Sequence, residues 1–284
     1  MNIHTWIPFL CGMILTSCSK TSNPVTGNGN AVPVPDGYKL IWNDEFNGDS
    51  IDTGKWDFMI GGHGWGNNEL QYYTNREDNA FIDDTVLVIQ ALKEDYEGSE
   101  YTSARLTTRG KRAWTYGRFD IRARMPFGQG VWPALWMMPE ESVYGGWAAS
   151  GEIDIMEYLG HETNKVYGTL HYGGSWPDNV HSGASYALEN GHFHSEFHLF
   201  TLEWEPGEIR WYVDGVHYST QTSETWYTDH ELNLINPHAP FDQDFHLIFN
   251  VAVGGNWPGD PNALTTFPQR MLVDYVRVYE KTED

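Results

Sequence analysis

The chain has 284 residues, of which 40% are hydrophobic and 15% aromatic, and it carries a formal net charge of −22. A chain of this length can bury one large core, so we expect a single folded domain. The strong negative charge repels phosphate backbones and anionic lipid headgroups, which excludes nucleic acid as a partner.

Residues 1–17 have the features of a signal peptide. Their apolar stretch from Trp6 to Leu15 is too short to span a bilayer, and it is followed by the sequence LTSC. That sequence resembles the bacterial lipoprotein box, in which the cysteine, here Cys18, becomes the lipidated first residue of the mature chain. The resemblance implies an exported lipoprotein of the cell envelope or cell surface, with a lipid as its sole membrane attachment. An ordinary cleaved signal, giving a secreted protein, and a buried cysteine are the alternatives.

Residues 18–37 are rich in Ser, Thr, Asn, Gly and Pro and have no hydrophobic period, which predicts a flexible linker. The folded domain is then expected to cover residues 38–284. The second cysteine, Cys11, lies inside the expected signal peptide, so we expect no disulfide in the mature protein.

From Leu40 onward, apolar residues recur with a period of two far more often than with a period of 3.6. In segment 116–126, Phe119 and Ile121 alternate with Arg118 and Asp120, which predicts a strand with one buried and one wet face. Asp214-Gly215 predicts a two-residue hairpin turn. Other predicted strands cover residues 85–93, 103–108, 131–138, 165–172, 197–204, 245–253 and 271–279. About ten short strands, with no helix longer than a turn or two, predict an all-β sandwich of two antiparallel sheets.

The segment GEIDIMEYLG, residues 151–160, places three carboxylates in an otherwise apolar strand. In a regular strand Glu152 and Asp154 share a face, whereas Glu157 points to the other. A β-bulge near Ile155-Met156 would turn all three to one face. Two glutamates there could lie ~5 to 5.5 Å apart, as retaining glycosidases require, with the charge of Asp154 helping to keep one of them protonated. A solvated strand edge or a calcium site is the alternative, and the apolar neighbours argue against an edge.

Sugar chains also need flat apolar surfaces, and the chain contains 13 tryptophans. Trp132 and Trp136 are four residues apart, so on an unbroken strand they share a face. Trp65 and Trp257 lie beside polar residues in loop-like segments. Each indole alone could equally belong to the core, but the cluster favours a sugar-binding surface.

These residues lie in a chain that resembles glycoside hydrolase family 16, in its laminarinase-like (endo-1,3-β-glucanase) form. GEIDIMEY resembles the catalytic signature of that family, and GWGNNELQYYT, YGRFDIRARMP, GVWPALWMMP, GTLHYGG and NVAVGGNWPGDP resemble other blocks of its bacterial members in the same order. The resemblance covers Tyr38 to Glu280. It implies a β-jelly roll whose concave sheet forms an open cleft.

The resemblance also implies residue roles. Glu152 would be the nucleophile, Glu157 the acid and then the base, and Asp154 a hydrogen-bonding partner of the nucleophile. Substrate-binding positions would be Asn67, Arg105, Trp132, Trp136, His171 and Trp257. The chemistry would need no cofactor. A structural calcium ion would be held on the convex side by the carboxylate of Asp274 and the backbone carbonyls of Glu45 and Thr85, although family members commonly have Gly at the last position.

The acidic net charge favours a neutral polysaccharide over a sulfated one. We therefore expect a monomeric hydrolase that cuts inside β-1,3-glucan of the laminarin type or mixed-linkage β-1,3-1,4-glucan, with retention of configuration. The alternatives are an agarase-type galactan hydrolase, a transglycosylase of the same family, and a glucan-binding module without catalysis.

Overall fold

The computed structural model describes residues 32–231 and 236–282. The expected signal peptide, Cys18 and most of the expected linker lie outside the described residues. The chain divides into two compact units, residues 1–36 and 37–284. In the first unit only residues 32–36 are described, and they form no helix or strand. Within the described ranges, no helix is both long and apolar enough to cross a membrane.

The second unit is built from β-strands, as predicted. Its described residues contain no α-helix, and a short 3-10 helix, η1, covers Gly64–Gly66. The strands are β1 (Tyr38–Asp44), β2 (Asp57–Phe58), β3 (Gln71–Tyr73), β4 (Ala80–Asp83), β5 (Val86–Tyr96), β6 (Ser99–Ser103), β7 (Arg105–Thr107), β8 (Gly117–Arg124), β9 (Val131–Pro139), β10 (Glu152–Tyr158), β11 (Lys165–Gly173), β12 (Asn179–Ala187), β13 (His198–Glu205), β14 (Glu208–Val213), β15 (Val216–Thr222), β16 (Phe245–Val253) and β17 (Gln269–Lys281).

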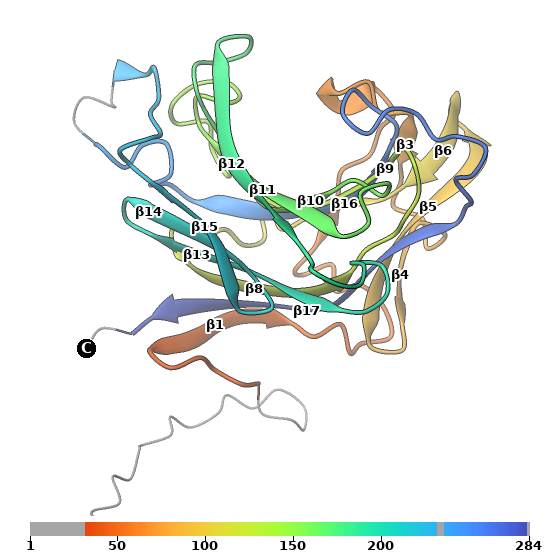
Figure 1. Ribbon diagram of the computed structural model, residues 1–284, viewed down its shortest axis with the longest axis horizontal. Helices are drawn as coiled ribbons and strands as arrows, with labels where there is room; N and C mark the ends of the chain where they lie inside the picture. The colour runs from red at the N-terminus through yellow and green to blue at the C-terminus, as the bar shows by residue number, and fades with distance from the viewer. Residues whose placement is uncertain (1–31, 232–235, 283–284) are drawn as a thin grey trace, which may run out of the picture. The chain divides into compact units, whose positions relative to one another are not determined.

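The strands form two sheets (Figure 1). The ten-stranded sheet has the order β15-β14-β13-β8-β17-β5-β6-β3, with β1 beside β17 and β4 beside β5, and the seven-stranded sheet has the order β12-β11-β10-β9-β16-β7-β2. The predicted all-β fold of two sheets is confirmed. The predicted number of strands was too low, because strands as short as β2 and β3 have too few residues to reveal an alternating pattern. One strand pair, β3 with β6, is parallel rather than antiparallel.

The core lies between the two sheets. Phe119 and Ile121 from the ten-stranded sheet belong to the same buried cluster as Leu135 and Ile153 from the seven-stranded sheet. These are the apolar positions of strands with a period of two, so each strand contributes one face to the core. The Asp214-Gly215 turn is also confirmed, since both residues have positive φ, of 50° and 78°, as a tight hairpin of this type requires.

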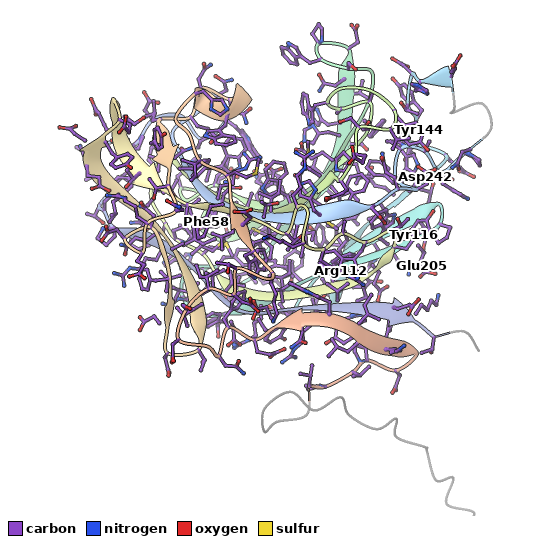
Figure 2. All side chains as sticks on the ribbon, turned by 180° about the vertical axis from the view of Figure 1, so that it is seen from behind. Phe58, Arg112, Tyr116, Tyr144, Glu205 and Asp242 are labelled. Carbon is purple, nitrogen blue, oxygen red and sulfur yellow. The ribbon has the colours of Figure 1, made fainter. Side chains whose placement is uncertain are left out.

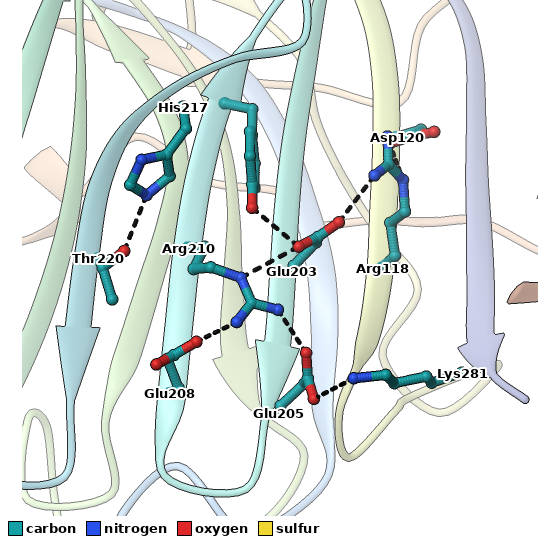
Figure 3. Close-up of polar contacts among 10 residues, drawn as sticks. Arg118, Asp120, Glu203, Glu205, Glu208, Arg210, His217, Thr220 and Lys281 are labelled. Atoms are coloured by element: carbon teal, nitrogen blue, oxygen red, sulfur yellow. Dashed lines mark hydrogen bonds and ion pairs between the residues drawn. The ribbon is translucent and has the colours of Figure 1, made fainter. Parts of the chain in front are cut away.

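The outer face of the ten-stranded sheet carries a network of charged residues (Figure 3). Glu203 accepts hydrogen bonds from Arg118 at 2.8 Å, Arg210 at 3.1 Å and Tyr212 at 2.9 Å. Asp120 is 6% exposed and accepts hydrogen bonds from Arg118 and the next strand. The prediction of a wet outer face on β8 is therefore wrong at Asp120, because the neighbouring strands β13 and β17 cover it with their own polar side chains.

The seven-stranded sheet curves strongly. In Figure 1 strand β12 rises steeply from one side, while β9, β10 and β16 lie at the base. Side chains that alternate away from the core on these strands therefore converge above the base of the sheet. The three carboxylates lie on β10, next to the central strand β9 of this sheet.

Candidate active site

Strand β10 contains the predicted β-bulge. In the pairing of β10 with β9, Asp154 lies opposite Trp136 and Met156 lies opposite Leu135. A step of two residues on β10 therefore matches a step of one residue on β9. The pairing of β10 with β11 also shifts, between Asp154 and Glu157. One residue of β10 is thus extra, and the alternation of its side chains is reset at this point.

The bulge turns the three carboxylates to one face. Glu152, Asp154 and Glu157 all line the same cavity. The two consecutive apolar residues between them, Ile155 and Met156, are 2% and 0% exposed and both belong to the core. A regular strand could not bury two neighbours on one side, so the burial pattern requires the bulge.

A tryptophan from the opposite sheet stabilises the bulge. The indole Nε1 of Trp211, on β14, donates a hydrogen bond to the backbone oxygen of Asp154 at 2.9 Å. Trp211 is fully buried. A bulge interrupts the ladder of backbone hydrogen bonds, and a buried carbonyl without a donor is costly, so this contact satisfies a group that the irregular strand would otherwise leave exposed to the apolar core.

The cavity is an open cleft of about 1060 Å³ that crosses the sheet from β12 to β7. All six substrate-binding positions expected from the sequence line it, namely Asn67, Arg105, Trp132, Trp136, His171 and Trp257. The structure thus brings together residues from β7, β9, β11 and two loops.

Glu152 lies at one side of the cleft. Its Oε2 accepts a hydrogen bond from Nε1 of Trp147 at 2.6 Å, and its Oε1 is 3.8 Å from Nε2 of His171. Burial, and next the charge of Asp154, raise the pKa of Glu152 to about 7, while His171, Trp147 and Arg105 act in the opposite direction. Near neutral pH this carboxyl is close to the point of ionisation.

Glu157 is 8% exposed. It accepts hydrogen bonds from Nε1 of Trp132 at 3.3 Å and from Oγ1 of Thr169 at 3.4 Å. Burial, and then the charges of Asp154 and Glu152, raise the pKa of Glu157 well above its ordinary range. This carboxyl therefore holds a proton more firmly than an ordinary glutamate does, as a general acid must.

His171 lies between the carboxylates of β10. Its Nε2 is 3.3 Å from Oδ2 of Asp154, in addition to its approach to Glu152. Burial alone would lower the pKa of His171, but Asp154 and the two glutamates outweigh it and raise this pKa to about 9. An imidazolium ion is thus expected here at neutral pH, and its charge favours the ionised forms of its neighbours.

Trp147 reaches Glu152 from the loop between β9 and β10, which is anchored to another segment through Tyr144 and braced internally by Ser150. The hydroxyl of Tyr144 hydrogen-bonds to both carboxylate oxygens of Asp242, at 2.8 and 2.7 Å, and the two side chains lie side by side in Figure 2. The Oγ of Ser150 accepts a hydrogen bond from the Tyr144 amide and donates one to the carbonyl of Gly145. The loop is therefore held in one conformation beside Glu152.

The cleft floor near β7 is an aromatic and cationic stack. The guanidinium group of Arg105 lies 4.5 Å from the ring of Trp65 and 4.6 Å from the ring of Trp136, between two indoles. Asn250 accepts a hydrogen bond from Nε1 of Trp136 at 2.7 Å and donates one to the hydroxyl of Tyr73 at 3.0 Å. These contacts fix the orientation of the Trp136 ring.

Several lining residues were not predicted from the sequence. Tyr167 and Thr169 precede His171 by four and two residues on β11, so the alternation of the strand contained a signal for both. Trp147 lies in a loop without a period, and nothing in its local sequence indicates a contact with Glu152. Further polar lining residues of this kind include Glu69, His181 and Asn250.

The donor atoms of the cleft also define its metal-binding potential. Among the described residues, Glu152, Asp154 and His171 are the one group of three acidic or histidine side chains whose ligand atoms lie within 4.8 Å of one another. Hydrolysis by a pair of carboxylates requires no metal ion, and these groups are already engaged with Trp147 and with each other.

The residues expected to hold calcium lie on the other sheet. Asp274 occupies an irregularity of β17, between the part that pairs with β5 and the part that pairs with β1. Glu45 follows β1 and Thr85 precedes β5, so the strand register brings the three positions to one place. The carboxylate of Asp274 forms an ion pair with Arg122 at 2.5 Å, so calcium would compete with that arginine. One carboxylate and two carbonyls would supply three of the six to eight oxygens that calcium takes, and waters would supply the rest.

An open cleft crossing a curved sheet, with two glutamates on its base and indoles along it, is the arrangement of a glycoside hydrolase. Residues 67–277 match the description "Glycosyl hydrolases family 16". The chain belongs to this family.

Relatives and solved structures agree with this placement. The chain is 49% identical over 255 residues to a β-glucanase of Rhodothermus marinus, covering 87% of this chain and 86% of that protein. It is 45% identical over 267 residues, 88% of this chain, to glucan endo-1,3-β-glucosidase A1 of Niallia circulans, but spans only 39% of that longer protein. The X-ray structure of the laminarinase from Rhodothermus marinus superimposes with a TM-score of 0.76 at 46% identity, covering 87% of this chain and 98% of that one.

Proposed function

We propose that the protein is an endo-acting, retaining glycoside hydrolase that cuts β-1,3-glucan of the laminarin type or mixed-linkage β-1,3-1,4-glucan. The observation that carries this proposal is the bulge in β10, which turns Glu152 and Glu157 to one face of an open cleft. The names of the two similar proteins, a β-glucanase and a glucan endo-1,3-β-glucosidase, support the choice of substrate.

In the first step, Glu152 attacks the anomeric carbon and forms a glycosyl-enzyme, while Glu157 gives its proton to the leaving oxygen. The pKa of Glu157, which burial and the nearby carboxylates raise, helps this carboxyl to keep its proton until the transfer. Trp147 and the imidazolium of His171 support the ionised form of Glu152, which must be an anion to attack.

In the second step, Glu157, now a carboxylate, removes a proton from water, and the water attacks the anomeric carbon from the side that the leaving group vacated. The bond between that carbon and Glu152 breaks, so the sugar is released and Glu152 returns to its carboxylate form. Two displacements at one carbon retain its configuration. Asp154 lies between the two glutamates and raises the pKa of both, so proton exchange at one carboxyl is coupled to the charge of the other.

The form of the cleft fits a polymer. The cavity crosses several strands and its base carries Trp132, Trp136 and Arg105, which present apolar ring faces and hydrogen-bond donors to sugar rings. An open cleft admits a chain along its length, so internal bonds can reach the glutamates. Cleavage inside the chain is the expected mode.

The test is a product profile. Wild-type protein is incubated with laminarin, barley β-glucan and agarose, and reducing ends and product masses are followed. We expect short oligosaccharides from the glucans and none from agarose, with loss of release in Glu152→Ala. Release from agarose alone would indicate a galactan hydrolase, products longer than an added oligosaccharide a transglycosylase, and binding without cleavage a glucan-binding module.

We also propose that the protein is exported as a lipoprotein anchored through Cys18, on the basis of the LTSC sequence. The wild-type protein, expressed in a bacterium that processes lipoproteins, should partition into the detergent phase of Triton X-114. Cys18→Ala should move it to the aqueous phase. Equal partition of the two proteins would favour the secreted form.

A further inference from the structure

Four aromatic side chains form a strip that passes the catalytic carboxylates at its two middle members, His171 and Trp147, and ends in solvent at Trp176. The rings of His181 and His171 are 5.5 Å apart, those of His171 and Trp147 are 5.6 Å apart, and those of Trp147 and Trp176 are 6.5 Å apart. The first three line the cleft, whereas Trp176 lies beyond its lining. The strip therefore continues the sugar-binding surface outward from the nucleophile.

Trp176 is the most solvent-exposed tryptophan among the described residues, at 73%, compared with 37% for Trp147. Indoles offer a large apolar face, and water is an unfavourable environment for it. An indole that is so exposed to solvent beside the cleft is therefore better explained by ligand binding than by the stability of the fold. The core gains almost nothing from this side chain.

The position of Trp176 is fixed by its backbone. It belongs to the connection between β11 and β12, and its amide donates a hydrogen bond to the carbonyl of Trp147 at 2.6 Å. In the same connection, Ser175 donates from Oγ to the carbonyl of Gly146 at 3.4 Å. Because the loop of Trp147 is itself anchored through Tyr144 and Asp242, both indoles are held by one connected support.

We propose that Trp176 forms an outer sugar-binding position at the β11–β12 side of the cleft, where it stacks on a glucosyl ring of a long glucan chain. This inference rests on the proposed glucanase function and extends it to chain length. The occupant is the same polysaccharide, because Trp176 is continuous through Trp147 with the surface that holds the bond to be cut. Sugar rings carry C–H groups on their faces, which pack on the flat apolar face of an indole.

The position of Trp176 outside the cleft lining predicts a dependence on substrate length. Only a chain that extends past Trp147 can reach it, so short oligosaccharides gain nothing from it. An aromatic contact of this kind changes binding by about two- to tenfold. Because Trp176 lies beyond the cleft lining that holds Glu152 and Glu157, its stacking is the same in the bound substrate and in the transition state, so the effect falls on KM rather than on kcat.

The experiment compares Trp176→Ala and Trp176→Tyr with the wild type on two substrates, polymeric laminarin and the shortest laminari-oligosaccharide that the wild type cuts. Val216→Ala, which truncates an exposed apolar side chain at the start of β15, is the matched control. For Trp176→Ala we expect kcat/KM on laminarin to fall by about two- to tenfold through KM. Activity on the short substrate should be unchanged, Trp176→Tyr should keep most of the affinity, and Val216→Ala should match the wild type.

A second readout does not need turnover. In a Glu152→Gln background, which binds substrate without cutting it, laminarin should change the fluorescence of exposed tryptophan, and adding Trp176→Phe should weaken that change. The outer sugar-binding position would be overturned if wild type and Trp176→Ala had equal kcat/KM on laminarin, or if Trp176→Ala lost equally on both substrates. The assignment as a hydrolase would stand in either case. A wild-type protein that cuts no glucan would overturn the proposed function, and the inference with it.

Discussion

The raised pKa of Glu152 makes a prediction about stability, which Glu152→Gln tests. Burial and Asp154 raise this pKa from its ordinary 4.5 to about 7 in the folded protein. Each pH unit of such a difference corresponds to ~1.4 kcal/mol, so ionised Glu152 lowers the free energy of unfolding by roughly 3 kcal/mol at pH 8. Glutamine has the same shape, can still accept the hydrogen bond of Trp147, and carries no charge.

The sign of the effect depends on pH. Below about 4.5 the carboxyl is protonated in both the folded and the unfolded chain, so the substitution changes little. Between about 4.5 and 7 the unfolded chain ionises first, and the free energy of unfolding of the wild type falls as the pH rises. Glu152→Gln should therefore be more stable than the wild type at pH 8, by roughly 5–10 °C in Tm for a domain of this size.

Differential scanning calorimetry at pH 4.5, 6 and 8 measures this difference. Glu94→Gln is the control of opposite sign, because hydrogen bonding by Thr102 and pairing with Arg76 lower the pKa of Glu94, so that its charge stabilises the folded state. That variant should have a lower Tm than the wild type at pH 8. The reasoning about Glu152 would be refuted by a Tm that is unchanged or lower at pH 8, or by a gain of equal size at pH 4.5.

Four further predictions concern the bulge, the acid, the imidazolium and calcium. Trp211→Phe leaves the Asp154 carbonyl without its hydrogen-bond donor, so it should reduce the free energy of unfolding in urea by about 1–3 kcal/mol. It should also lower kcat. An unchanged kcat would show that this hydrogen bond to the bulge does not matter for catalysis. Glu157→Gln should slow laminarin hydrolysis by roughly 10²–10⁴-fold. Azide should restore cleavage of an activated aryl glucoside by this variant, with a β-glycosyl azide as product. An α-glycosyl azide would instead show that Glu157 is the nucleophile and Glu152 the acid. His171→Gln removes a positive charge that lowers the pKa of Glu152. The acidic limb of the pH profile of kcat/KM should therefore move to higher pH. A shift to lower pH would contradict this role of His171. Calcium should raise the Tm of the EDTA-treated wild type slightly and should leave Asp274→Asn unchanged; equal shifts in both would place the ion elsewhere.

Much of the site was accessible from local sequence patterns. The alternation of apolar and polar residues fixes which face of a strand each side chain occupies, and this was enough to group Trp132 with Trp136. The spacing of Glu152, Asp154 and Glu157 conflicts with that alternation, and the conflict itself predicted the bulge. Resemblance to a family then supplied Asn67, Arg105 and Trp257, which lie far apart in the chain and share no local pattern.

Contacts between segments that lie far apart in the chain could not be predicted from local sequence patterns. Trp147 reaches Glu152 because Tyr144 binds Asp242, about a hundred residues later in the chain. Asp120 is buried although its own strand predicts exposure, because β13 and β17 cover it.

The sequence by itself therefore determined the β class, the strand faces and the acidic residues of the cleft, since each depends on the near-neighbour geometry of one strand. Only the tertiary structure decided how strongly each carboxyl is desolvated and which indole hydrogen-bonds to it. Desolvation and Coulomb interactions depend on everything that packs around a group, and most of the groups around Glu152 and Glu157 come from other strands and loops.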